Sequence, residues 1–248
     1  MENSQNILVS TEDGSNTLYS KKYNQHFHNT KDGAINEALH KHIFPAFLYH
    51  QNKKELNILD ICFGLGYNSF ATIFYILENN LDIKINIYSP ELDFDLIKSL
   101  QNFSYPKEFE KFRNIINELS LNQKYEDEKI KIELFIGDAR EVLKTFPNNF
   151  FDIVYQDAFS SEVNYELWTK EYFEDIYKIS KEDCIITTYA IATPIRLSMY
   201  EAGFKIYQDR ALNKKISLGF KKEQNSMGKV VNMEWKQVVN KELKALYD

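Results

Sequence analysis

Glycine, proline and cysteine are all scarce in this chain of 248 residues, which contains 8 glycines, 5 prolines and 2 cysteines. So few glycines and prolines exclude a loop-dominated or low-complexity protein. Cys62 and Cys184 stand at apolar strand positions and lack the spacing of metal ligands, so the sequence predicts no metal site. We expect two buried thiols in a reducing compartment.

Long apolar runs are also missing from the sequence. No segment approaches the run of roughly 18 apolar residues that a membrane-spanning helix needs, and residues 1–6 lack the basic start and apolar region of a signal peptide. We therefore expect a cytoplasmic protein outside the membrane. The net charge of -6 excludes a global attraction to nucleic acid, but a local basic patch can still supply one. Charge alone neither names nor excludes RNA as a partner.

Hydrophobic residues are abundant, at 44% of the chain, and aromatic residues make up 15%, which is ample for a large core. The length suits one α/β domain with appendages, since single domains of this kind reach about 250 residues. We expect an N-terminal extension that packs on the core over 1–50, a core domain over 51–222 and a peripheral C-terminal helix within 223–248.

The most informative segment is 58–68, ILDICFGLGYN, in which an apolar strand runs into a turn with two glycines and then into a helix. Glycine at such a turn adopts conformations that a Cβ forbids and lets a ligand lie against the main chain, and Gly64 and Gly66 fit that role. The third glycine of the dinucleotide fingerprint is replaced by Ser69, which weakens the case for NAD and FAD. A strand ending in Asp60 followed by G-x-G is the commoner form in enzymes that bind S-adenosylmethionine.

Predicted strands and helices alternate from residue 56 onward, which indicates right-handed crossovers and a mainly parallel sheet with helices on both faces. The last two strands are joined by a short connection that suits an antiparallel hairpin. A mainly parallel seven-stranded sheet closed by such a hairpin is the Rossmann-like arrangement of class I methyltransferases. The predicted strands are 56–61, 83–88, 130–136, 151–155, 184–189, 204–208 and 216–220, the predicted helices are 33–49, 68–78, 93–100, 108–119, 168–179 and 235–247, and 122–129 is a predicted polar loop.

Acidic residues stand at the ends of four predicted strands, where a doubly wound sheet binds its ligand. The first of them is Asp60, at the end of the first strand. Glu91 follows the second strand about 25 residues after Gly66, near the spacing of an acid that holds ribose hydroxyls, and Asp93 competes for that role. Asp138 ends the third strand, where a carboxylate can accept from an adenine amino group. Asp157 ends the fourth strand at the centre of the crevice. Each acid alone also fits a helix N-cap, but four in register favour a ligand site.

Histidines and lysine pairs give weaker signals. His40 and His42 are two residues apart and cannot share a helix face as metal ligands do, so we expect hydrogen-bonded or surface histidines. The basic pairs 21–22, 214–215 and 221–222 are typical of solvated faces. The last two pairs flank the terminal hairpin, where they can form a local phosphate-binding rim.

Short motifs are spread along the chain from about residue 11 to 222. They are 11–20 (TEDGSNTLYS), His28, 33–35 (GAI), 37–40 (EALH), 63–68 (FGLGYN), 157–169 (DAFSSEVNYELWT), 186–189 (ITTY), 192–196 (ATPIR) and 201–204 (EAGF). Together they resemble the methyltransferase domain of the MnmC family, and the opening and fourth-strand motifs are the most specific. The chain departs from the family pattern at Ala158, at 160–161 and at Tyr165, beside the predicted substrate pocket.

The resemblance implies a function that the spacing of residues does not. It implies transfer of a methyl group from S-adenosyl-L-methionine to the aminomethyl nitrogen of 5-aminomethyl-(2-thio)uridine at the tRNA wobble position. In two-domain members a flavin-dependent oxidase follows, and 248 residues leave no room for one, so we expect the stand-alone form without FAD. Functional coupling to the enzymes that place aminomethyl and carboxymethyl groups on uridine is implied as well.

The predicted site combines the glycine turn, the strand-end acids and the resemblance. Asp157 is the predicted catalytic residue, which orients the amine and accepts its proton directly or through water. Phe159, Trp168 and Tyr189 are the predicted substrate contacts, since aromatic rings can stack on a base, although core packing is the default for such rings. The predicted cofactor contacts are Asp60, Phe63, Gly64, Gly66, Asn68, Glu91, Asp138, Ala139 and Asp157, and no metal is predicted.

Two other functions fit parts of the sequence. A small-molecule amine methyltransferase, or an aminopropyltransferase of the spermidine synthase type, shares the strand-end acids. The latter is expected to carry a second acid in a D-x-x-D pattern, where this chain has Ser160. A non-catalytic module would bind cofactor or RNA and transfer no methyl group. Cofactor binding in calorimetry without methylation of any tRNA would indicate such a module.

Overall fold

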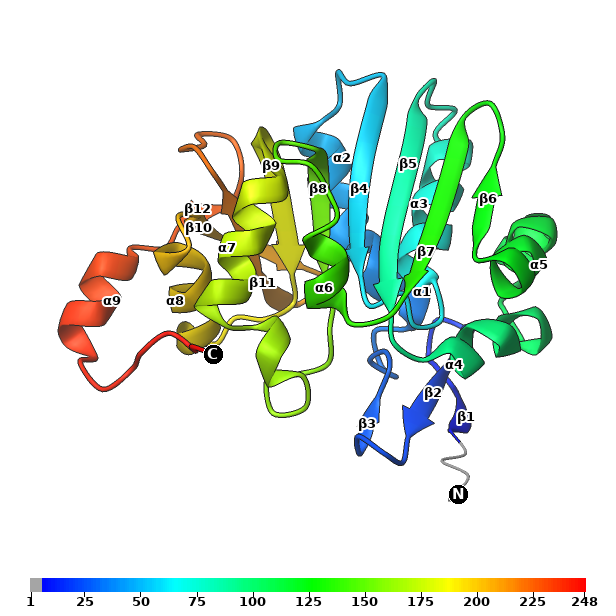
Figure 1. Ribbon diagram of the computed structural model, residues 1–248, viewed down its shortest axis with the longest axis horizontal. Helices are drawn as coiled ribbons and strands as arrows, with labels where there is room; N and C mark the ends of the chain where they lie inside the picture. Colours follow the sequence, from blue (N-terminus) through cyan, green and yellow to red (C-terminus); the bar gives the residue numbers. More distant parts are fainter. Residues whose placement is uncertain (1–5) are drawn as a thin grey trace.

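The computed structural model describes residues 6–248 and contains a mixed sheet with helices on both faces, together with a small sheet near the N-terminus (Figure 1). Neighbouring strands β7, β5, β4, β8 and β9 are parallel. β11 pairs antiparallel with β9, and β10 pairs antiparallel with β11. The strands of this 9-stranded sheet are β4 (Glu55–Ile61), β5 (Lys84–Glu91), β6 (Lys124–Glu126), β7 (Ile130–Ile136), β8 (Phe151–Gln156), β9 (Ser180–Thr188), β10 (Lys205–Ala211), β11 (Lys214–Phe220) and β12 (Lys229–Val230).

The predicted mainly parallel sheet closed by an antiparallel hairpin is confirmed, with differences at the two edges of the sheet. The sequence predicts seven strands, and the short strands β6 and β12 add one to each edge. β6 lies within the predicted polar loop and pairs antiparallel with β7. Strands of two or three residues carry too little apolar alternation to be recognised from sequence. The hairpin strands are longer than predicted, because residues 209–211 and 214–216 pair across a turn at Leu212 and Asn213.

Helices cover both faces of the large sheet, with α6 and α7 in front of it and α2 and α3 behind it in Figure 1. Each face has its own apolar core, and β8 is buried along its whole length because both of its faces are covered. The helices are α2 (Phe44–Tyr49), α3 (Tyr67–Glu78), α4 (Phe94–Ser99), α5 (Arg113–Asn122), α6 (Ala139–Leu143), α7 (Lys170–Ile179) and α8 (Thr193–Glu201), with 3-10 turns over Leu100–Asn102, Lys107–Phe112 and Tyr165–Leu167.

The segment before β4 begins with a small antiparallel sheet of β1 (Ile7–Ser10), β2 (Asn16–Ser20) and β3 (Gln25–His26). This N-terminal sheet lies below the edge at which the parallel strands end (Figure 1). Its TEDGS turn is tied to the helix that follows, because the Asp13 carboxylate accepts hydrogen bonds from the amides of Ile35 and Asn36, each at 3.1 Å. Gly33 makes this contact possible, since a Cβ there would lie 1.9 Å from the Asp13 carboxyl carbon.

The predicted helix over 33–49 is one continuous helix with a π-helical turn at its centre. α1 (Ala34–Ala38) leads into the π turn over Leu39–Ile43 and then into α2 (Phe44–Tyr49). In the π turn the amide of Phe44 donates to the carbonyl of Leu39, five residues earlier. The next residue, Pro45, has no amide to donate. A π turn amounts to one extra residue in a helix and is frequent at functional sites.

The predicted C-terminal helix over 235–247 is wrong in its second half. α9 covers Met233–Val239, and the chain then returns across the molecule without helical structure. The amide of Lys170 donates to the carbonyl of Leu246 at 2.7 Å, and Arg140 forms an ion pair with Asp248. Backbone bonds of this kind fix an extended tail that apolar spacing alone does not reveal. None of the helices within 6–248 combines the length and the apolar character needed to cross a bilayer.

Candidate functional site

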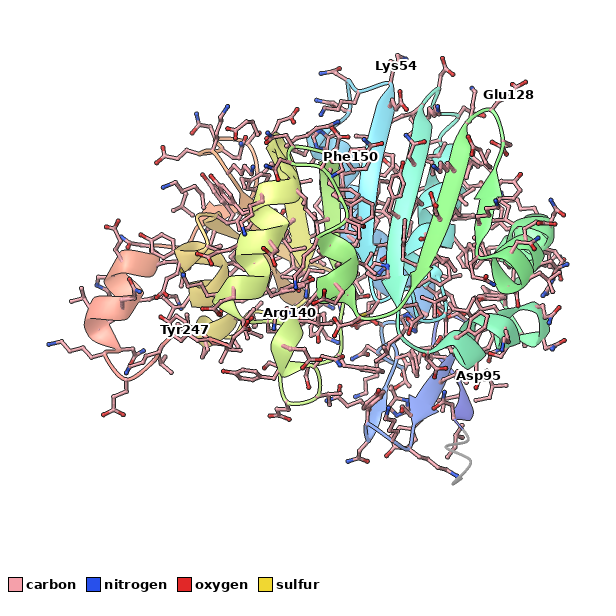
Figure 2. The ribbon with its side chains drawn as sticks, in the orientation of Figure 1. Lys54, Asp95, Glu128, Arg140, Phe150 and Tyr247 are labelled. Atoms are coloured by element: carbon pink, nitrogen blue, oxygen red, sulfur yellow. The ribbon has the colours of Figure 1, made fainter. Side chains whose placement is uncertain are left out.

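A cavity of about 1440 Å³ opens where the parallel strands end, between that edge and the N-terminal sheet. Figure 2 shows Asp95 and Arg140, which follow β5 and β7, near this lower edge, and Lys54 and Glu128 at the opposite edge. The cavity wall is formed by the turn after β4, the ends of β5, β7, β8 and β9, the N-terminal sheet, the helix of the π turn and the β10–β11 turn. The structure thus brings most of the predicted site residues together.

The glycine turn after β4 forms one wall of the cavity, and its backbone adopts conformations that few residues other than glycine can adopt. Gly66 has φ of 74°, and a Cβ there would lie 2.6 Å from the Phe70 ring and 2.7 Å from the Phe63 ring. Gly64 has φ of 55° and lines the cavity. Cys62 also has a left-handed backbone, with φ of 64°, a conformation that is uncommon outside glycine, asparagine and aspartate. Cys62 is only half-buried and lines the cavity, so the prediction of a buried thiol is wrong for Cys62 and confirmed for Cys184. Desolvation by the surrounding protein still raises the pKa of the Cys62 thiol well above the ordinary value.

Asp60 is predicted to contact the cofactor, but the structure places it behind the cavity wall, with 1% of its surface exposed. Its carboxylate accepts from the Ser69 hydroxyl at 2.8 Å and from the Asn68 amide at 3.2 Å. Burial raises the pKa of Asp60 to about 7, although the bonds from Ser69 and Asn68 lower it. In this arrangement Asp60 supports Asn68, which does line the cavity.

Glu91 lines the cavity and also holds the glycine turn. One carboxylate oxygen accepts from the amide of Gly64 and the other from the amide of Asp93, each at 2.8 Å. Burial raises the pKa of Glu91, and these amide bonds offset part of that rise. Each oxygen keeps a lone pair for a further donor such as a ribose hydroxyl. Asp93 caps α4 through the amide of Leu96 at 2.9 Å.

Asp138 and Ala139 line the cavity at the end of β7. Asp138 caps α6 by accepting from the amide of Arg140 at 2.8 Å, so capping and a ligand contact are both open to this carboxylate. Gly137, just before it, has φ of 152°, and a Cβ there would meet no atom within 4 Å. Since Gly137 lines the cavity, a side chain at this position would extend into it.

Asp157 projects from the end of β8 into the cavity, with 17% of its side chain exposed. Its Oδ2 accepts from the Asn68 amide at 3.0 Å, and its Oδ1 lies 3.4 Å from Nε2 of His42. Burial raises the pKa of this carboxyl, but the neighbouring imidazoles of His42 and His28 and the bond from Asn68 lower it by more, so its pKa lies below the ordinary value. Asp157 is therefore ionised at neutral pH.

Residues from the helix of the π turn complete the inner wall and carried no predicted role. Glu37 forms an ion pair with Lys41, and the Lys41 nitrogen lies 5.7 Å from the centre of the Tyr189 ring. His42 is fully buried beneath them. One signal was available in the sequence, because the helical spacing that marks Ile35 as buried also places His42, a polar residue, on the buried face.

The three predicted aromatic contacts have different environments. Phe159 lines the cavity and packs against Phe27 of the N-terminal segment, with ring centres 5.1 Å apart. Tyr189 lines the cavity, and its hydroxyl donates to the Ala158 carbonyl at 2.9 Å. Trp168 is fully buried and outside the cavity wall. Its ring nitrogen donates to the Phe159 carbonyl at 2.8 Å, so it holds the loop after β8 that carries Phe159 and that accepts the hydrogen bond from Tyr189.

The lysine pairs at the hairpin lie at opposite ends of it. Lys214 and Lys215 line the mouth of the cavity, and Lys214 forms an ion pair with Asp32 at 2.6 Å. Lys221 is instead buried, with its nitrogen 2.6 Å from the carbonyl of Ser180 at the start of β9. A phosphate-binding rim formed by both pairs is therefore wrong, since the second pair is far along the strands from the cavity.

The cavity fits an adenosine-bearing amino acid. Carboxylates of Glu91 and Asp138 can accept from hydroxyl and amino groups, and Gly64 and Gly137 leave room beside the main chain. The Asn68 side-chain oxygen is buried and accepts no hydrogen bond from any described residue, so its capacity as an acceptor is unused. Within 6–248, no group of three or more histidine, cysteine, aspartate or glutamate side chains is arranged to hold a metal ion.

Comparison with known proteins agrees with this geometry. Residues 105–219 match the family model of an S-adenosyl-L-methionine-dependent methyltransferase. An uncharacterized protein of Methanocaldococcus jannaschii is 29% identical over 88% of this chain and 60% of its own length. The tRNA 5-methylaminomethyl-2-thiouridine biosynthesis bifunctional protein MnmC of Campylobacter fetus is 24% identical over 90% of this chain. The chain spans 37% of the length of that bifunctional protein.

Two solved structures are similar to the whole fold. MnmC2 from Aquifex aeolicus matches with a TM-score of 0.82 and 28% identity, over 96% of this chain and 77% of its own. A probable spermidine synthase from Corynebacterium glutamicum matches with a TM-score of 0.60 and 14% identity, over 100% of this chain and 94% of its own, which shows a shared fold. The family model, the MnmC relatives and the MnmC2 structure agree with the cavity described above. Together these findings support an S-adenosyl-L-methionine-dependent methyltransferase domain of the MnmC type.

Proposed function

We propose that the protein methylates the aminomethyl nitrogen of 5-aminomethyl-(2-thio)uridine at the wobble position of tRNA. The observation that carries this proposal is the environment of Asp157. Its ionised carboxylate faces the cavity, and among the described residues no lysine or arginine nitrogen lies within 4.0 Å of it. Glu37, another acid that lines the cavity, is by contrast neutralised by Lys41. A cationic ammonium group would complete the charge balance at Asp157.

An alkylamine is the substrate group that this carboxylate suits. Such an amine is largely protonated at neutral pH, so it enters as an ammonium ion that a carboxylate attracts and hydrogen-bonds. Asp157 is anchored by Asn68 on one oxygen and keeps lone pairs directed at the ligand. This places the nitrogen at a fixed point near the end of β8, and positioning of this kind accounts for much of the rate of group transfer.

The reaction requires the amine to lose a proton and attack along the line of the bond that breaks. When bound, S-adenosylmethionine would supply a methyl group on a sulfonium, and transfer of that methyl group would leave a neutral thioether as the leaving group. Asp157 holds the nitrogen and accepts its proton directly or through water, which frees the lone pair for attack. Glu91 and Asp138 would hold the ribose and adenine, and Gly64 the amino-acid part. Phe159 and Tyr189 would flank the uracil ring.

Two features of the relatives and of the cavity support tRNA as the substrate. The Campylobacter relative is named for biosynthesis of 5-methylaminomethyl-2-thiouridine in tRNA, a product that carries a methylated aminomethyl group. Lys22, Lys214 and Lys215 line the cavity mouth, where cationic side chains can approach phosphates although the net charge is -6. Functional coupling to the enzymes that make the aminomethyl precursor belongs to the same proposal.

The proposal is tested with tRNA from cells that lack this methylation, incubated with labelled S-adenosylmethionine and analysed as nucleosides. We expect methylaminomethyluridine from the wild type and a loss of at least about 100-fold in turnover for Asp157→Asn, with cofactor affinity in calorimetry nearly unchanged. Asp95→Asn, at an exposed carboxylate on the cavity rim, is the matched control and should keep full turnover. A wild-type enzyme that methylates no tRNA, or methylates only a free amine such as a polyamine, would refute the proposal.

A further inference from the structure

His42 is a fully buried polar side chain directly behind the Asp157 carboxylate. It lies on the π turn over Leu39–Ile43, and 0% of its surface is exposed. Its Nδ1 lies 2.8 Å from the hydroxyl oxygen of Thr187 in β9. A buried imidazole is costly unless its nitrogens are hydrogen-bonded, so the second nitrogen also needs a partner.

That second nitrogen, Nε2, faces Asp157. It lies 3.4 Å from Oδ1 of the carboxylate and has no hydrogen-bond partner in the part of the chain that the structure describes. Oδ2 of the same carboxylate accepts from Asn68 at 3.0 Å. His42 and Asn68 therefore flank the two oxygens of one group. Hydrogen bonds in catalytic sites are often long in the free enzyme and shorten in the complex with substrate.

Thr187 and Asp157 together decide which nitrogen of His42 carries the proton. A neutral imidazole has one donor nitrogen and one acceptor nitrogen. When the Thr187 hydroxyl donates to Nδ1, the proton is on Nε2 and points at the negative oxygen of Asp157. In the reverse arrangement a lone pair on Nε2 would face that oxygen, and the two would repel. The first arrangement is therefore the more stable one.

We propose that His42 is a positioning residue that donates from Nε2 to Asp157 and fixes the plane of its carboxylate toward the amine of the substrate. This inference rests on the proposed function, because it assigns a partner to the carboxylate that holds the attacking nitrogen. The π turn supports it independently. The extra residue distorts the helix at the point where Lys41 and His42 both reach the cavity wall, and such turns occur frequently at functional sites.

The groups around the pair limit how a pH profile is interpreted. The ring of Tyr155 is 5.5 Å from the ring of His42, centre to centre. The other titratable groups near His42 and Asp157 are the same in the wild type and in the variants. A difference between the pH profiles of two enzymes therefore reports the contact between His42 and Asp157. The titratable neighbours are Asp60 in β4, Cys62 in the glycine turn, His28 after the N-terminal sheet, Glu37 and Lys41 on the helix, Tyr155 in β8 and Tyr189 after β9.

The test compares His42→Phe, which keeps a ring and removes the donor, with Thr187→Val, which keeps the shape and removes the hydroxyl. Thr187→Ser is the matched control, since it keeps the hydroxyl. For His42→Phe we expect kcat to fall about 10- to 100-fold and the acid limb of kcat/KM to move up by about one pH unit, because the carboxylate loses a donor that stabilises its charge. Cofactor affinity in calorimetry should stay within about threefold. Thr187→Val should show the same changes in weaker form, and Thr187→Ser should restore wild-type values.

A second readout does not depend on activity. Nitrogen NMR of the wild-type enzyme should show a protonated Nε2 and an unprotonated Nδ1 at His42. The His42 signals are identified by their absence from the spectrum of His42→Phe or, should that variant not fold, of His42→Gln. The opposite tautomer would overturn the inference, and so would a His42→Phe enzyme with wild-type kcat and pH profile. Failure of the proposed function is distinguishable, because then the wild type itself would methylate no tRNA.

Discussion

Asp60 offers a direct test of the electrostatics behind the site. Its carboxyl is buried, and its pKa is raised from 3.8 to about 7. A carboxyl whose pKa is higher in the folded state than in the unfolded state destabilises the fold as pH rises. The penalty is absent below the unfolded pKa, grows between about pH 4 and pH 7, and is fully present above pH 7. Asp60→Asn removes this titration and keeps the shape.

The size of the effect follows from the shift. A rise of about 3 pH units corresponds to about 4 kcal/mol at alkaline pH, as an upper limit. Between pH 5 and pH 8 the penalty on the wild type grows by about 2 to 3 kcal/mol. The amide that Asp60→Asn introduces can accept from Asn68 and donate to the Ser69 hydroxyl oxygen, so a hydrogen bond is kept at both contacts.

The assay is urea unfolding of wild type and Asp60→Asn at pH 5 and pH 8. We expect the stability of the variant relative to the wild type to rise by about 2 to 3 kcal/mol between these two pH values. Asp95→Asn, at a side chain that is 94% exposed, should differ from the wild type by the same amount at both. If the difference for Asp60→Asn does not change with pH, the buried carboxyl is not titrating as the structure indicates, and the reasoning fails.

Three further variants test other parts of the site. Gly66→Ala should destabilise the fold by at least about 2 kcal/mol in urea unfolding, because its φ is positive and the new Cβ would overlap the rings of Phe63 and Phe70. Glu91→Gln should weaken cofactor binding about tenfold in calorimetry, since a charged acceptor for ribose is lost. Asp13→Ala should lower unfolding stability by about 2 kcal/mol, because two amides of α1 lose their acceptor.

The sequence predicted most of the fold because its central strands are apolar and buried. β8 is buried along its whole length and β4 along most of it, whereas IKIELFI at 130–136 alternates between buried and partly exposed residues, a pattern that also predicts a strand. The short edge strands β6 and β12 were not predicted, since their two or three residues form a strand through hydrogen bonds to a neighbouring strand and not through an apolar pattern. The extended tail after Val239 was not predicted either, because its position depends on hydrogen bonds from its backbone to Lys170 and Ser198.

The site was predictable to the extent that it follows from strand ends. Glu91, Asp138 and Asp157 come to one cavity because parallel strands end at one edge. Asp60 and Trp168 were also predicted to contact a ligand, but both side chains face the core. Whether a side chain near a strand end faces the cavity or the core depends on packing. The partnership of His42 with Asp157 joins residues 115 positions apart, and spacing along the chain cannot indicate such a contact.

The π turn over Leu39–Ile43 also has a consequence for the register of its helix. Because it holds one residue more than an α-helical turn needs, deletion of a single residue there would leave a regular helix. Each residue of an α-helix advances the chain by about 100° and 1.5 Å. Such a deletion would therefore rotate α2, with its buried Phe47, about 100° relative to Glu37. The helix can place either its cavity groups or its core groups correctly with regular geometry, and the extra residue is what lets it place both.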